Sequence, residues 1–237
     1  MDAKDRLIVA LDEFSFVSAK RLVKQLSPYV TYFKVGLEFA TAVGVPHAVK
    51  LVRGFGCRTF LDCKFKGIPY TLGGATQAAA ALNVAMVSID ASSGTKALRT
   101  AANRKGQALL FAATVLTSFN EQQCRFIYGA SVKEKVLQFA RIAEYAGCDG
   151  IICSPRELEY VSTLEFKHLL KMTPGIRPAW APPDDQQRTM TPHEAIQAGA
   201  DYLVVGRSIT RPPKNIGGPQ KAAQLIIEEI NAVLKGH

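Results

Sequence analysis

Short and almost continuously apolar runs recur along the chain and alternate with amphipathic segments. The runs begin near eight positions, namely Leu7, Thr31, Arg58, Val84, Ala108, Asp149, His168 and Asp201. Runs such as Leu-Ile-Val-Ala-Leu lack the polar alternation of half-exposed strands, which is typical of parallel strands covered by helices. Most intervals show helical periodicity, for example Phe16 to Leu26 and Val132 to Tyr145. The pattern therefore predicts eight β-strand and α-helix units.

Eight such units in 237 residues match the usual size of a closed (β/α)8 barrel. An open doubly wound sheet would normally use fewer strands. With 48% hydrophobic residues and no Pro/Gly/Ser linker, the chain fits one large domain better than two small ones. We therefore expect an α/β protein, a single (β/α)8 TIM barrel over residues 1–237, whose site lies at the carboxyl ends of the strands.

Composition and the cysteines indicate the compartment. The charged start of the chain leads directly into a strand and leaves no room for the apolar stretch of a signal peptide. No apolar run approaches membrane-spanning length. The five cysteines are an odd number without Cys-x-x-Cys spacing, and most sit in apolar runs. We expect a reduced, cytoplasmic protein with no membrane contact.

The net charge of +9 raises the question of a nucleic-acid partner. The basic residues are scattered along helical segments and do not cluster with aromatic residues, so nucleic acid is not the expected partner. A general positive field would equally help to capture a small phosphorylated anion.

Charged residues stand at or near the ends of three predicted strands. Asp62 and Lys64 lie two positions apart, so on a strand both side chains leave from the same face, while Asp12 and Lys34 lie on two other strands. Two ammonium groups and a carboxylate in one pocket can stabilise charge developing on carbon, and one lysine can donate a proton. This arrangement favours breaking a bond to a carboxyl group. The alternative is a buried ion pair that only holds the strands in register.

A second signal points to phosphate. The eighth strand ends in Gly206 and Arg207, where a glycine lets the backbone approach a ligand and an arginine offers a planar fork for phosphate oxygens. The long irregular stretch from Pro174 to Pro192 contains Arg177 and Gln186, which can converge on the same anion. Its end, Thr189 to Pro192, is typical of a helix N-cap followed by proline. The alternative is that Arg207 pairs with an acidic residue on a helix.

Several motifs follow one another in a fixed order along the whole chain. They are Leu-Ile-Val-Ala-Leu-Asp12, Phe-Lys34-Val-Gly, Asp62-Cys-Lys64-Phe-Lys-Gly-Ile-Pro, Val-Leu-Thr117-Ser, Pro-Gly-Ile-Arg177-Pro, Asp-Gln186-Gln-Arg-Thr-Met-Thr-Pro and Val-Val-Gly206-Arg207. In this order they resemble the orotidine 5′-phosphate decarboxylases of the bacterial type. The resemblance implies decarboxylation of orotidine 5′-monophosphate to uridine 5′-monophosphate in pyrimidine biosynthesis. It also implies a homodimer with sites completed across the interface, and no metal or organic cofactor.

The resemblance further implies a role for each matched residue. The charged catalytic array would consist of Lys34, Asp62 and Lys64, with Lys64 protonating C6 after carbon dioxide leaves. The phosphate would be held by Arg177, Gln186 and Arg207. Asp12 would bind the ribose, Thr117 would contact the edge of the pyrimidine ring, and Thr71 would reach the ribose of the neighbouring subunit's ligand.

One position departs from the family pattern Asp-x-Lys-x-x-Asp, whose last aspartate is donated across the dimer interface. This chain has Gly67 there, preceded by Lys66. With Asp62 as the remaining counter-charge, we expect repulsion between Lys34 and Lys64 to lower the pKa of a lysine or to let a side chain move. The resemblance thus predicts a looser array and impaired turnover.

Asp90, at the end of the fourth strand, stands where bacterial relatives commonly have histidine. It could restore negative charge near Lys64 or pair with Lys66, and we favour the pair with Lys66, because two changes of opposite sign compensate each other.

Two other functions remain open at this point. One is a related phosphosugar lyase or aldolase that grips a divalent metal with a carboxylate on the second strand, and Lys34 in that place argues against it. The other is a non-catalytic protein that binds a nucleotide or phosphate ligand, and Gly67 is the feature in its favour. The retention of Lys34, Asp62 and Lys64 favours the decarboxylase.

Overall fold

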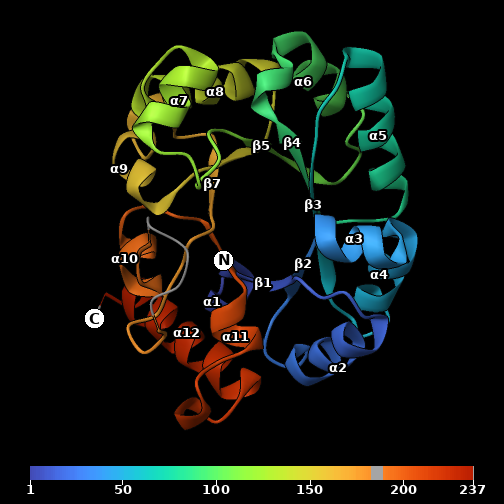
Figure 1. Ribbon diagram of the computed structural model, residues 1–237, viewed down its shortest axis with the longest axis vertical. Helices are drawn as coiled ribbons and strands as arrows, with labels where there is room; N and C mark the ends of the chain where they lie inside the picture. Colours follow the sequence, from blue (N-terminus) through green and yellow to red (C-terminus); the bar gives the residue numbers. More distant parts are fainter. Residues whose placement is uncertain (183–188, 237) are drawn as a thin grey trace.

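The strands close into a parallel barrel in which each strand pairs with the next and β8 pairs with β1 (Figure 1). The computed structural model describes residues 1–182 and 189–236. The strands are β1 (Leu7–Leu11), β2 (Tyr32–Gly36), β3 (Arg58–Phe65), β4 (Met86–Asp90), β5 (Leu109–Ala113), β6 (Gly150–Ile152), β7 (Leu170–Thr173) and β8 (Tyr202–Val205). The predicted (β/α)8 barrel is confirmed, and each predicted strand begins within two residues of an observed one.

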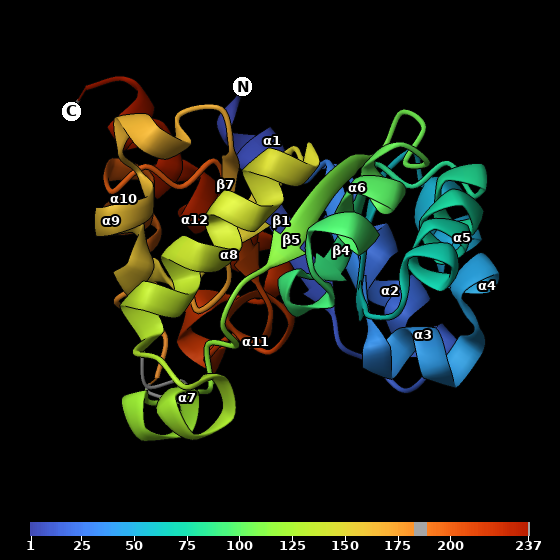
Figure 2. The ribbon, with the colours of Figure 1, turned by 90° about the horizontal axis from the view of Figure 1, so that it is seen from above.

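Helices surround the barrel as an outer ring (Figures 1 and 2). The longer ones are α2 (Phe16–Leu26), α4 (Val45–Arg53), α5 (Pro69–Ala81), α6 (Thr95–Ala102), α7 (Glu121–Tyr128), α8 (Val132–Ala146) and α12 (Pro219–Leu234). Shorter ones are α1 (Ala3–Arg6), α3 (Leu37–Val43), α9 (Leu158–Val161), α10 (Pro192–Gln197) and α11 (Arg207–Thr210). The helix predicted over Phe16 to Leu26 has the observed bounds, whereas α1 precedes the first strand where no helix is predicted.

Two apolar layers account for the unbroken hydrophobic runs of the strands. Alternate residues such as Ile8 and Ala10 point into the barrel, while Leu7, Val9 and Leu11 pack against the helices. Inside the barrel, Tyr202 meets Tyr32 and Phe111 edge to face, with ring centroids 6.1 and 5.9 Å apart. This packing fills the barrel interior and leaves the carboxyl ends of the strands for polar groups.

The long connection between β7 and α10 is anchored at both ends. Ile176 and Met190 form an isolated bridge, and the backbone N–H of Arg177 donates to the carbonyl of Met190 at 2.8 Å. Thr191 caps α10 through a capping box with Glu194, and Pro192 is the first helical residue, as predicted. Gln186 lies outside the described residues.

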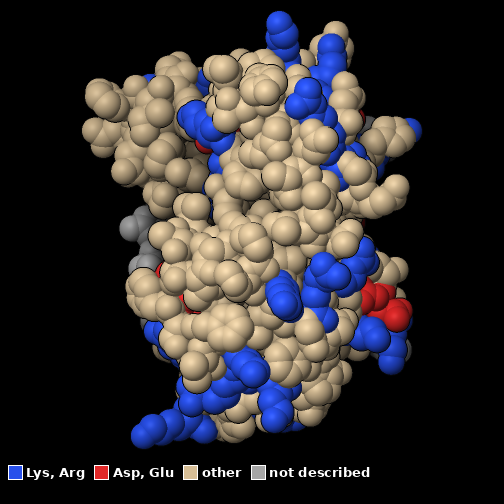
Figure 3. All heavy atoms as spheres, turned by 90° about the vertical axis from the view of Figure 1, so that its right-hand side faces the viewer, with Lys and Arg blue, Asp and Glu red and all other residues tan. Residues whose placement is uncertain are grey.

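Basic residues mark the surface of the right-hand side of Figure 1. Figure 3 shows this face with Lys and Arg far more common than Asp and Glu, and with a largely uncharged middle. Two helices contribute the bases Lys20, Arg21 and Lys24 on α2, and Lys50 and Arg53 on α4. In the described ranges, no helix combines the length and the apolar composition that crossing a membrane requires.

Candidate active site

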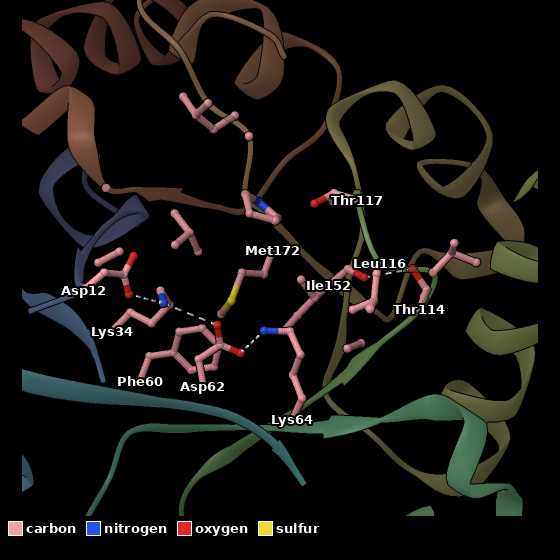
Figure 4. A pocket seen from close by; sticks show the side chains of 18 of the residues that line it. Asp12, Lys34, Phe60, Asp62, Lys64, Thr114, Leu116, Thr117, Ile152 and Met172 are labelled. Atoms are coloured by element: carbon pink, nitrogen blue, oxygen red, sulfur yellow. Dashed lines mark hydrogen bonds and ion pairs between the residues drawn. The ribbon is translucent and has the colours of Figure 1, made fainter. Parts of the chain in front are cut away.

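A cavity of about 250 Å³ opens at the carboxyl ends of the strands, which suits one small ligand (Figure 4). Seven of the residues singled out from the sequence line it, namely Asp12, Lys34, Asp62, Lys64, Thr117, Gly206 and Arg207. The sequence does not single out the apolar part of the lining, which includes Phe60, Ile152, Met172 and Val204. These are inward-facing strand positions, and an apolar residue there carries no signal that separates a pocket wall from barrel core.

The charged side chains form an alternating row across the cavity floor (Figure 4). The Nζ of Lys34 lies 3.0 Å from Oδ1 of Asp12 and 3.7 Å from Oδ2 of Asp62. The Nζ of Lys64 lies 2.9 Å from Oδ1 of Asp62. The residue after β1 and the two neighbouring strands β2 and β3 therefore deliver a row in the order Asp12, Lys34, Asp62, Lys64.

The row keeps its buried members charged. Burial by itself raises the pKa of Asp62, but Lys64, Lys34 and a hydrogen bond from Ser88 outweigh it, and the pKa lies below its ordinary value. Burial by itself lowers the pKa of Lys34, but the carboxylates of Asp62 and Asp12 outweigh it, and the pKa lies above its ordinary value. The expected lowering is therefore wrong for Lys34, because Asp12 supplies a second counter-charge that the sequence argument assigned only to the ribose.

Gly36, at the end of β2, leaves room for the ammonium group of Lys34. A Cβ atom at this position would lie 2.6 Å from Nζ of Lys34 and 3.2 Å from Oδ1 of Asp12. Gly36 also pairs with Asp62 across the β2–β3 ladder, so the glycine sits beside the centre of the row. Any side chain there would displace Lys34.

The end of β3 is irregular where it carries Asp62 and Lys64. Leu61 pairs with Val87 and Phe65 pairs with Ile89, so β3 advances four residues while β4 advances two. Lys64 has a φ of 45°, in the left-handed region that residues other than glycine rarely adopt. The side chains of Asp62 and Lys64 do meet, as the sequence predicts, but through a bulge in addition to simple strand alternation.

Near Gly67, where the chain departs from the family pattern, Lys66 pairs with Asp90 as the sequence analysis predicts. The Nζ of Lys66 lies 3.8 Å from Oδ2 of Asp90, which confirms the preferred pairing. Oδ1 of Asp90 accepts a hydrogen bond from the backbone of Ser92. The backbone N–H of Gly67 donates to Oγ of Ser93 at 3.4 Å. Asp90 is thus held by Lys66 and by its own turn.

Two predicted residues lie away from the cavity lining. Arg177 follows the lining residues Pro174 to Ile176, and its guanidinium donates to the carbonyl of Pro182 at 3.3 Å. Thr71 is exposed on the first turn of α5 beside Gly67 and is not among the residues that line the cavity. Their roles in ligand binding stay predictions, as does the role of Gln186.

Gly206 and Arg207 bring the end of β8 to the cavity. Gly206 precedes α11, and a Cβ atom there would lie 3.6 Å from Cβ of Ala10 and 3.7 Å from Oδ2 of Asp12. Such contacts are ordinary, so glycine here keeps space open beside Asp12. Arg207 adds a permanent positive charge to the same wall.

The fold and the charged row define the class of protein, a (β/α)8-barrel enzyme with its pocket at the carboxyl ends of the strands. The chain belongs to the Orotidine 5′-phosphate decarboxylase / HUMPS family, whose model matches residues 5–224. It is 42% identical over 245 residues to an orotidine 5′-phosphate decarboxylase of Moorella thermoacetica, covering 98% of this chain and 95% of the relative.

Two further relatives agree. An orotidine 5′-phosphate decarboxylase of Nitrosococcus oceani is 43% identical over 235 residues, covering 97% of this chain and 99% of the relative. The crystal structure of orotidine 5′-phosphate decarboxylase from Lactobacillus acidophilus matches with a TM-score of 0.83 and 30% identity, covering 96% of this chain and 100% of that one.

The position of Asp62 predicts an acid-sensitive contribution to stability. Because its folded pKa lies below the ordinary 3.8, the ionised carboxylate adds stability that is fully present above the ordinary pKa and is lost as the pH falls through the folded one. Asp62→Asn should lower the free energy of unfolding by about 3 kcal/mol at about pH 7. Urea unfolding at about pH 7 and about pH 3 should show the difference from the unaltered chain shrinking in acid.

Asp90→Asn is the matched control. It removes the charge from a partly exposed ion pair and keeps a side chain that can cap the turn at Ser92. We expect a change below about 0.5 kcal/mol at either pH. If Asp62→Asn and Asp90→Asn lowered the free energy of unfolding equally, the special contribution of Asp62 to stability would be contradicted.

Proposed function

We propose that this protein decarboxylates orotidine 5′-monophosphate to uridine 5′-monophosphate in pyrimidine biosynthesis. The observation that carries the proposal is the alternating row of Lys34, Asp62 and Lys64 on the floor of a pocket whose wall bears Arg207. The relatives that cover almost the whole chain bear the name of this activity.

The reaction follows from the charges in the row. The C6–carboxyl bond of the substrate breaks, carbon dioxide leaves, and the electron pair stays on C6. Ammonium groups of Lys34 and Lys64 stabilise that charge, and Asp62 keeps both in place without rearrangement during the reaction. A proton then passes from Nζ of Lys64 to C6, and solvent restores it to the lysine.

Asp62 has a second effect on the substrate. Its carboxylate is held charged on the cavity floor, where the substrate's own carboxylate must lie near Lys64. Like charges at short distance disfavour the bound substrate, and the repulsion disappears as carbon dioxide forms. The row thus favours the transition state over the ground state.

We propose the following contacts for the rest of the nucleotide. In the proposed complex, Arg207 holds the phosphate with Gln186 and Arg177, Asp12 binds the ribose, and Thr117 contacts the ring. Asp12, Thr117 and Arg207 all line the cavity, which supports this placement. The guanidinium of Arg177 would have to turn from Pro182 toward the ligand.

The two other functions have weaker support. A metal-dependent lyase needs a set of acidic or histidine ligands, and in residues 1–182 and 189–236 no three His, Cys, Asp or Glu side chains are grouped to bind a metal ion. A binding protein without catalysis has no need to hold two ammonium groups against one buried carboxylate.

We also propose a homodimer in the cytoplasm. Large apolar side chains are exposed after the neighbouring strands β1, β2 and β3, namely Phe14, Leu37, Ile68 and Tyr70. They follow the strands that carry Lys34 and Lys64, and in the proposed dimer a second copy would cover them and complete the site. The five cysteines are free thiols, which supports a reducing compartment.

Release of carbon dioxide from orotidine 5′-monophosphate tests the function directly. Lys64→Ala should lower the turnover number about 10³-fold, because the proton donor is lost. Lys66→Ala removes the lysine two residues further on, which pairs with Asp90, and should change the rate less than about threefold. The rate should not respond to a metal chelator. An unaltered chain that binds uridine 5′-monophosphate but releases no carbon dioxide would support the binding protein.

Gly67 predicts a gain of function. A Cβ atom at Gly67 would meet Thr71 at an ordinary 3.6 Å, and the backbone of Gly67 is not in the left-handed region, so a residue with a Cβ can stand there. In a dimer, Gly67→Asp would supply the carboxylate that the family pattern places across the interface, and we expect the turnover number to rise at least about tenfold. Gly67→Asn has the same shape without the charge and should not raise it. Equal rates in both variants would contradict an electrostatic role for this position.

The exposed apolar residues predict where two copies meet. Tyr70→Glu places a charge at a side chain that is 79% exposed beside the site and should shift the protein to the monomer in sedimentation equilibrium. Tyr145→Glu is the matched control, because Tyr145 is 73% exposed on α8, outside the proposed interface. A dimer that survives Tyr70→Glu and dissociates with Tyr145→Glu would place the interface elsewhere.

A further inference from the structure

Ser88 is a buried polar residue in the middle of β4 that sequence reasoning passes over. It lies within the apolar run Met-Val-Ser-Ile and is completely buried. Its neighbours in the barrel are Phe111 on β5 and the irregular end of β3. A hydroxyl in such a place needs partners, because burying one without hydrogen bonds is unfavourable.

Both hydrogen-bonding capacities of the Ser88 hydroxyl are used on the catalytic row. Oγ accepts a hydrogen bond from the backbone N–H of Lys64 at 2.8 Å. Because the ionised carboxylate of Asp62 can only accept, the hydroxyl of Ser88 donates its proton to Oδ1 of Asp62, also at 2.8 Å. Oδ1 accepts from Nζ of Lys64 as well, at 2.9 Å. Ser88, Asp62 and Lys64 thus close a ring of hydrogen bonds through one lysine's backbone and side chain.

The ring sits where the backbone is under strain. The bulge in β3 interrupts the ladder with β4 between Leu61 and Phe65, and Lys64 is held at a φ of 45°. A side-chain hydroxyl on β4 takes over a hydrogen bond that the ladder can no longer provide. A strained backbone persists where surrounding contacts hold it in place, and the hydrogen bond to Ser88 is one such contact for Lys64.

We propose that Ser88 is a positioning residue for the reaction, which fixes the bulge so that Asp62 faces both lysines and Lys64 points its ammonium group into the cavity. This inference rests on the proposed function. The donation to Oδ1 of Asp62 orients the carboxylate with Oδ1 on Lys64 and Oδ2 on Lys34. Without it, the carboxylate can rotate and Lys64 can relax toward ordinary strand geometry.

Ser88→Ala tests the proposal by removing both hydrogen bonds. We expect the turnover number to fall about tenfold to a hundredfold, while KM and the Kd of uridine 5′-monophosphate change little, because the ligand contacts remain. Loss of the donor also raises the pKa of Asp62 toward its ordinary value, so the acid limb of the turnover number should move to higher pH. Ser88→Cys fills the site with a slightly larger group that is a weak hydrogen-bond donor. Its turnover number should lie between those of the unaltered chain and of Ser88→Ala, and this variant serves if the alanine variant folds badly.

Thr59→Val is the matched control. Thr59 is a buried residue of β3 whose hydroxyl has no partner among the described residues, so its loss should leave the rate and the pH profile unchanged. The proposal would be overturned if Ser88→Ala left the turnover number and the acid limb of its pH profile unaltered. It would also be overturned if Ser88→Ala lowered the turnover number no more than Thr59→Val does.

Crystal structures separate this inference from the proposed function. If the unaltered chain releases no carbon dioxide, the proposed function fails, and the structures of the unaltered chain and of Ser88→Ala still decide the role of Ser88. We expect Lys64 to leave the left-handed region and its Nζ to separate from Asp62 in the variant. A variant that keeps both the positive φ and the contact with Asp62 would refute positioning by Ser88.

Discussion

Asp62 is buried at the carboxyl end of the barrel with an ammonium group on either side. The rest of the site depends on this carboxylate staying ionised. A lone buried carboxylate would take up a proton, and two ammonium groups without it would repel each other. The carboxylate of Asp62 stays ionised because the two ammonium groups flank it, and the two ammonium groups stay close together because the carboxylate lies between them. The strand order supports this arrangement, because β2 and β3 are neighbours and Gly36 opposite Asp62 gives Lys34 room to approach.

The charge balance explains why the row is stable before any ligand binds. Two lysines alternate with Asp62 and Asp12, while Lys66 and Asp90 form a separate pair. The missing carboxylate at Gly67 therefore does not leave the positive charge of Lys34 unbalanced, because Asp12 and Asp62 both contact it. It leaves Lys64 at the end of the row, with Asp62 on one side, and this is where the family pattern would place a further acid.

The sequence predicts the barrel well because each of its signals is local. A parallel strand covered on both faces reads as a continuous apolar run, and the stretch from Thr189 to Pro192 marks where a helix starts. The charged residues of the site are also visible, since a Lys or Asp at the end of an apolar run needs a reason to be there. The pairing of Lys66 with Asp90 follows from charge alone.

Other features depend on contacts that no local pattern reveals. The bulge that sets Lys64 at a positive φ arises from the pairing of β3 with β4, and Ser88 reads as an ordinary small residue in a strand. Asp12 is predicted to bind a ribose, yet in the structure it also holds Lys34. In the proposed complex Asp12 would therefore have two partners, and the motif match indicates one of them.

In the proposed complex, the two contacts of Asp12 would couple ligand binding to the charged row. When ribose hydroxyls donate to Asp12 in the proposed complex, they compete with Lys34 for the same oxygens, and Lys34 is drawn toward Asp62 and the reacting carbon. The 3.7 Å between Nζ of Lys34 and Oδ2 of Asp62 leaves room for that approach. The ribose, far from the bond that breaks, can thereby strengthen the field at C6, which is how binding energy at a remote part of a substrate assists the chemical step.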